Sequence, residues 1–91
     1  MIEKVFTISN KLGLHARPAS AFVKTTSQYQ CNFKVRKGDH EVDGKSIMGL
    51  LMLAAGPGTE LQISAEGIDE EEAIAALKDL FDRKFDDEDK D

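Results

Sequence analysis

The sequence predicts an α+β domain in which three helices lie on one face of a largely antiparallel sheet of four strands. Some segments alternate between apolar and polar residues, as half-buried strands do, whereas in others the apolar residues recur every three or four positions, as in amphipathic helices. These segments follow the order β-α-β-β-α-β-α. Helices layered on one side of a sheet bury the apolar side of both kinds of element. The chain of 91 residues therefore predicts a single domain, residues 1–91, in which about 86–91 form a solvated acidic tail.

The first half of the chain predicts three strands and one helix. Apolar residues on one face predict a strand over 2–9, and a loop then leads to a helix over 16–27. Alternation over 31–36 predicts a second strand with one buried face. A tight turn at 37–39 and a short strand at 40–42 complete a hairpin.

The second half predicts a short helix, a strand and a final helix. Ser46 is a favourable N-cap for a helix over 47–54, and the Gly-Pro-Gly sequence at 56–58 ends that helix. The alternating segment 60–66 is typical of a strand.

The final helix has its own start signals. Asp69 and Glu72 have the spacing of a capping box, in which two side chains accept hydrogen bonds from backbone N–H groups at the helix start. Ile68 and Ala73 are spaced for a hydrophobic staple. The apolar stripe of this helix contains Ala73, Ile74, Leu77, Leu80 and Phe81.

Composition excludes several classes of protein. Basic residues do not form a stripe interleaved with aromatics, and the net charge is −5, so nucleic acid is not an expected partner. The N-terminus lacks the apolar stretch of a secretory signal, and the longest apolar run, 47–56, is too short to span a membrane. The single cysteine, Cys31, is expected to be a buried, inert thiol. We therefore expect a cytoplasmic protein without membrane insertion.

Charge is distributed unevenly along the chain. Residues 1–50 carry eight Lys or Arg and four Asp or Glu, a net charge of +4, whereas residues 51–91 carry four and thirteen, a net charge of −9. The basic half favours an acidic partner surface.

Residues 13–19, Gly-Leu-His-Ala-Arg-Pro-Ala, place a histidine and an arginine at the start of the first helix. Proline is tolerated only in the first helical turn, so Pro18 puts His15 at or next to the N-cap. The unpaired N–H groups and the positive end of the helix dipole favour an anion there. A ring nitrogen of His15 is a nucleophile, and Arg17 offers a planar fork of donors to phosphate oxygens. The segment therefore predicts a site that holds a phosphoryl group.

The second segment of interest is 44–51. A phosphate on Ser46 would meet the field of a helix N-terminus, which makes this N-cap residue a candidate modification site. The helix that follows is apolar nearly all round, so we expect it to present Ile47, Met48 and Leu51 partly to the outside.

Residues 13–19 and the Lys-Ser-Ile-Met-Gly sequence at 45–49 resemble the two signature segments of the HPr family, the histidine-containing phosphocarriers of the bacterial phosphotransferase system. The resemblance covers essentially the whole chain. It implies an open-faced β-sandwich, with helices packed on a four-stranded antiparallel sheet, and a phosphoryl group carried on Nδ1 of His15.

The resemblance also implies a role for each matching residue. His15 would accept the phosphoryl group from phosphorylated enzyme I and donate it to an enzyme IIA protein, with Arg17 contacting the phosphate. Ser46 matches the position at which an HPr kinase/phosphorylase modifies many relatives to slow transfer. The protein would be a monomeric intermediate and not a stand-alone enzyme, with no cofactor and no metal. The partner-binding residues implied by the resemblance are Ser20, Lys45, Ile47, Met48 and Leu51.

Three alternatives remain open at the level of sequence. The 44–55 segment and the acidic last helix also resemble NPr, the carrier of the nitrogen-related branch of the same system. A second class is a small regulatory module that uses this fold to bind an effector or a protein. A metal site on His15 and His40 is the weakest alternative, because their spacing matches no ligand motif.

Overall fold

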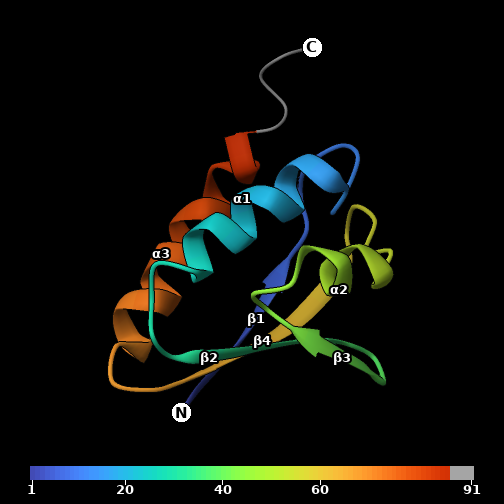
Figure 1. The fold of residues 1–91 in the computed structure, drawn as a ribbon. Helices are drawn as coiled ribbons and strands as arrows, with labels where there is room; N and C mark the ends of the chain where they lie inside the picture. Colours follow the sequence, from blue (N-terminus) through green and yellow to red (C-terminus); the bar gives the residue numbers. More distant parts are fainter. Residues whose placement is uncertain (87–91) are drawn as a thin grey trace.

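The computed structural model describes residues 1–86, which form four strands, three α-helices and a short 3-10 turn (Figure 1). Their order confirms the predicted β-α-β-β-α-β-α arrangement. Of the predicted acidic tail, Asp86 belongs to the 3-10 turn, and 87–91 lie outside the described residues. The elements are β1 (Ile2–Thr7), α1 (Ala16–Thr26), β2 (Asn32–Lys37), β3 (His40–Asp43), α2 (Ile47–Met52), β4 (Glu60–Glu66), α3 (Glu70–Asp82) and η1 (Lys84–Asp86).

The four strands form one sheet in the order β1-β4-β2-β3, and every neighbouring pair is antiparallel. Phe6 on β1 pairs with Leu61 on β4, and Ile63 on β4 pairs with Val35 on β2. This register places apolar residues of adjacent strands on the same face. All three helices cover that face, so the predicted open-faced layering is confirmed (Figure 1).

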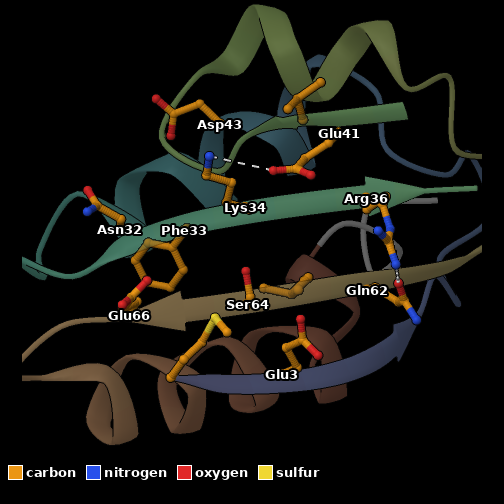
Figure 2. A pocket seen from close by; sticks show the side chains of 13 residues that line it. Glu3, Asn32, Phe33, Lys34, Arg36, Glu41, Asp43, Gln62, Ser64 and Glu66 are labelled. Carbon is orange, nitrogen blue, oxygen red and sulfur yellow. Dashed lines mark hydrogen bonds and ion pairs between the residues drawn. The ribbon is translucent and has the colours of Figure 1, made fainter. Parts of the chain in front are cut away.

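The opposite face of the sheet is mostly polar, and no helix of residues 1–86 covers it (Figure 2). Lys34 forms an ion pair with Glu41 at 3.6 Å, and the Arg36 guanidinium donates to the side-chain oxygen of Gln62. These side chains border a hollow of about 830 Å³. Because they pair with one another across the strands, they stabilise the sheet surface.

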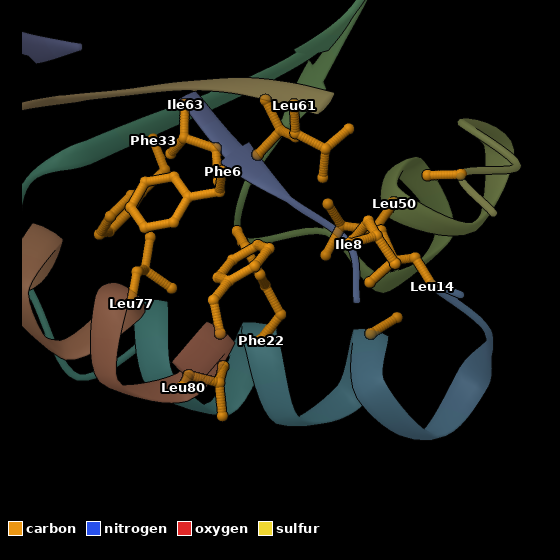
Figure 3. Packing of buried hydrophobic residues seen from close by; sticks show 14 of the residues in the cluster. Phe6, Ile8, Leu14, Phe22, Phe33, Leu50, Leu61, Ile63, Leu77 and Leu80 are labelled. Atoms are coloured by element: carbon orange, nitrogen blue, oxygen red, sulfur yellow. The ribbon is translucent and has the colours of Figure 1, made fainter. Parts of the chain in front are cut away.

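The core lies between the sheet and the helices (Figure 3). Phe22 of α1 and Leu77 of α3 are fully buried against the strands. Phe81 packs on Phe6 and on Phe85 of η1, with ring centroids 4.7 and 4.8 Å apart. The five apolar residues predicted to form the stripe of the last helix are all buried.

The start of α3 differs from the predicted capping box. The Asp69 carboxylate makes no capping bond and instead accepts from the backbone N–H groups of Gln30 and Cys31, at 2.7 and 2.9 Å. Glu70, not Glu72, reaches back to a backbone N–H, that of Gly67. The predicted staple is also wrong, because 92% of the Ile68 surface is exposed.

The Asp69 contact joins the start of β2 to the start of α3, which are 38 residues apart in the chain. Cys31 is 1% exposed, which confirms the expected buried thiol, and this burial, with Asp69 alongside, raises the pKa of the Cys31 thiol. The hydrogen bond from Gln30 N–H, and then that from Cys31, hold the pKa of Asp69 below its usual value.

We predict that Asp69→Asn destabilises the protein at neutral pH and flattens the acid side of its stability profile. A carboxyl whose pKa is lowered by folding stabilises the fold above its unfolded pKa of about 4, and this contribution is lost as the pH falls through the lower folded value. Urea unfolding at about pH 7 and about pH 3 should therefore show a difference from wild type that shrinks in acid. The control is Glu72→Gln, which removes an exposed charge of the same helix turn. A pH-independent difference for Asp69→Asn contradicts the assignment.

Candidate functional site

The backbone that leads into the first helix is held by the segment that follows α2. Leu14 N–H donates to the Ala55 carbonyl at 2.8 Å, and the Leu14 side chain is buried beside Leu50 of α2 (Figure 3). Gly13 has a φ of +74°, and a Cβ there would lie 2.5 Å from the Ala55 oxygen. Only glycine fits this close approach, so Gly13 and Leu14 fix the position of the next residue, His15.

His15 is the N-cap of α1, as predicted. Its backbone is extended, with φ −97° and ψ −167°, and its carbonyl accepts from Ala19 N–H at 2.9 Å. Its side chain makes no capping hydrogen bond, so the imidazole is not needed to close the helix start. The ring is partly exposed. Arg17 is exposed and Pro18 is buried in the same first turn, which contains no acidic residue.

Ser46 is confirmed as the N-cap of α2, because its Oγ accepts from Gly49 N–H at 3.0 Å. The loop before it is held against the end of α1. Thr26 Oγ1 donates to the Gly44 carbonyl at 2.9 Å, and Lys45 Nζ donates to the Tyr29 carbonyl at 2.7 Å. The Lys45 ammonium therefore anchors this loop. Its Nζ also lies over the Phe33 ring, 6.0 Å from the ring centroid.

Helix α2 is shorter than predicted and exposes most of its apolar residues. It ends at Met52, and Ala54 adopts a left-handed conformation with φ +51°, which turns the chain so that the next carbonyl meets Leu14. Leu50 is its only buried residue. The exposed apolar residues around it, which we call the α2 surface, are Ile47 (41% exposed), Met48 (71%), Leu51 (37%) and Met52 (77%), with Leu12 (72%) from the loop before α1.

Sequence reasoning missed two members of the α2 surface. Met52 stands four positions after Met48, a spacing that places both on one side of a helix. Leu12 is the exposed apolar residue of the loop before α1, in which Leu14 is buried.

The electrostatic environment of this region is basic. Residues 4–38 and 44–59, which include α1, α2 and their loops, contain no Asp or Glu. The first turn of α3, in contrast, contains Glu70, Glu71 and Glu72. The uneven charge seen in the sequence therefore corresponds to a difference between the helices of the fold.

Three other features of the described residues bear on alternative sites. In the hollow on the open sheet face, Lys34 pairs with Glu41 and Arg36 with Gln62 (Figure 2). Within residues 1–86 there is no group of three His, Cys, Asp or Glu side chains able to hold a metal ion, and His40 lies apart from α1, on β3. Searched over the same residues, no helix has the length and apolar character needed to cross a membrane.

The sequence and the fold are similar to those of known proteins. Residues 2–83 match a family model described as PTS HPr component, phosphorylation site. The chain is 48% identical over 85 residues to the phosphocarrier protein HPr of Neisseria meningitidis, a match that covers 93% of this chain and 96% of the relative. It is 52% identical over 81 residues to HPr of Pseudomonas aeruginosa, covering 88% and 90%.

Solved structures agree with this result. The crystal structure of HPr from Thermoanaerobacter tengcongensis superposes with a TM-score of 0.92 at 49% identity, over 97% of this chain and 99% of that one. Fold, sequence and family model thus converge, and the chain belongs to the HPr family of phosphocarrier proteins of the phosphotransferase system.

Proposed function

We propose that His15 is the residue that carries the phosphoryl group, accepting it from phosphorylated enzyme I and passing it to an enzyme IIA protein in the cytoplasm. The observation that carries this proposal is the placement of His15. Its partly exposed imidazole stands at a helix start, is not used as a cap, and lies in a chain that matches a phosphorylation-site family. In the transfer, the lone pair of Nδ1 attacks phosphorus while the bond to the donor breaks and its electron pair leaves with the donor.

Arg17 and the start of α1 stabilise the charge of the transferred group. The guanidinium offers paired donors to phosphate oxygens, and the first-turn N–H groups have no partners within a helix. The dipole of a helix end stabilises an anion by only about 0.3–1 kcal/mol, or about 2 kcal/mol in good geometry. That range suits a carrier, because the phosphoryl group is steered to His15 and still leaves for the next protein.

The α2 surface is proposed as the docking site for both partners, together with Ser20 and Lys45. Exposed apolar residues grouped beside a basic helix start fit a partner with an apolar centre and acidic surroundings. Methionine side chains adapt to different contact shapes, so Met48 and Met52 suit a surface that meets enzyme I and enzyme IIA proteins in turn.

Ser46 is proposed as a regulatory site that an HPr kinase/phosphorylase would modify. It is partly exposed and directly precedes Ile47 of the α2 surface. A phosphate there would add about 1.5 to 2 negative charges beside a surface suited to an acidic partner, and repulsion would slow acceptance at His15.

Within the family, we place the chain with the HPr carriers, since the relatives that are 48% and 52% identical to it carry the name HPr. The nitrogen-related carrier NPr remains the alternative. Assaying the exchange of phosphate with each enzyme I paralogue and each IIA domain separates the two.

We predict that His15→Ala abolishes phosphorylation by enzyme I and phosphoenolpyruvate and leaves the fold intact, because the imidazole does not cap α1. The matched control is His40→Ala, since the chain has two histidines and the second lies on β3. The measurement is incorporation of an acid-labile, base-stable phosphoryl group, with circular dichroism to check folding. If His15→Ala incorporates the phosphoryl group to the wild-type level, the proposal is wrong.

For Ser46→Asp we expect transfer of the phosphoryl group from enzyme I to slow by roughly tenfold, because the new carboxylate would repel an acidic partner surface. Aspartate and asparagine are both good N-caps, so Ser46→Asn is a control that keeps the cap without the charge. The rate should recover in Ser46→Asn and the defect of Ser46→Asp should weaken at high salt. Equal rates for the two variants argue against charge as the regulator.

Met48→Gln should raise the KM for phosphorylated enzyme I about five- to thirtyfold without lowering stability, since exposed anchor residues of an interface contribute about 1–2 kcal/mol. The control is Ile68→Gln, which removes an apolar side chain beside α3 that is 92% exposed, against 71% for Met48. If the two variants show the same KM, the α2 surface is not the docking site.

A further inference from the structure

We propose that Lys37 is a positioning residue for phosphoryl transfer, which holds the end of α2 in the place that both the docking surface and His15 require. This inference rests on the proposed function and adds to it a residue outside both signature segments. Lys37 is the last residue of β2. Its ammonium donates to the carbonyl oxygens of Leu53 at 2.9 Å and Ala54 at 3.4 Å, directly after α2.

The location of Lys37 is unusual for a lysine. Along β2 the side chains of Phe33, Val35 and Lys37 share the face that the helices cover, and the first two are fully buried. A half-buried ammonium needs acceptors in place of water, because burying it without partners is costly. The two carbonyl oxygens supply these acceptors, so the Lys37 side chain is held in this contact.

Helix α2 needs a cation at its end. It has only six residues, too few for a stable helix without tertiary contacts, and no basic residue in its last turn. The final carbonyls of any helix lack partners within it and carry the negative end of the dipole. Lys37 supplies the charge from the sheet, while Ser46 caps the other end of the same helix.

The same segment carries the loop that positions His15. The carbonyls of Leu53 and Ala54 bind Lys37, and the next carbonyl, that of Ala55, binds Leu14 N–H at 2.8 Å. Three consecutive carbonyls thus connect the sheet, the end of α2 and the residue before His15. Release of Lys37 would loosen the α2 surface and the His15 loop together.

The test compares Lys37→Met with Lys34→Met in the full chain. Lys34 is on the same strand and carries the same charge, but it faces the open side of the sheet, where it pairs with Glu41. We expect Lys37→Met to raise the KM for phosphorylated enzyme I roughly three- to tenfold with a smaller change in kcat, and Lys34→Met to leave both unchanged. Lys37→Arg should restore KM, since a guanidinium also donates to two carbonyls.

Two further readouts separate positioning from other effects. The defect of Lys37→Met should persist at high salt, where a simple loss of charge attraction is screened. Hydrogen exchange of the Leu14 amide should accelerate about tenfold in Lys37→Met and not in Lys34→Met.

The outcomes distinguish this inference from the proposed function. If the wild-type protein does not accept a phosphoryl group on His15, the proposed function is wrong. Hydrogen exchange of the Leu14 amide then still tests the structural role of Lys37. If the wild-type protein transfers the phosphoryl group normally, and Lys37→Met changes neither the KM nor the exchange of the Leu14 amide, the inference about Lys37 is wrong and the proposed function stands.

Discussion

The hydrogen bond from Leu14 N–H to the Ala55 carbonyl, 2.8 Å long, is the contact on which the site depends. It joins two loops that are distant in sequence, one leading into α1 and one leaving α2. Gly13 makes the approach possible, since any Cβ there would overlap the Ala55 oxygen. Because His15 follows Leu14 directly, its place relative to the α2 surface is set by this contact.

The two helices at the site, α1 and α2, have different roles. Helix α1 presents His15, the proposed nucleophile, and the cation of Arg17 at its start, and the core holds this helix through residues such as Phe22. Helix α2 gives the core only Leu50 and leaves its other apolar residues to solvent, an arrangement that costs stability within the monomer and suits an interface. Ser46 and Lys37 secure the two ends of this otherwise weak helix.

Sequence patterns predicted the features that depend on local spacing. The alternation of Phe33 and Val35 located β2, and Ser46 was correctly expected to cap α2. The capping box at Asp69 failed because the carboxylate found two backbone donors 38 and 39 residues away, which no local pattern reveals. The role of Lys37 was missed for the same reason, since its acceptors lie 16 and 17 residues further along the chain.

If His15 carries the phosphoryl group, localisation of that group on the wild-type chain will show it. After incubation with phosphoenolpyruvate and enzyme I, fragmentation mass spectrometry at alkaline pH should find one phosphoryl group, on His15. A phosphoryl group on His40 or Ser46 in place of His15, or none at all, would contradict the account.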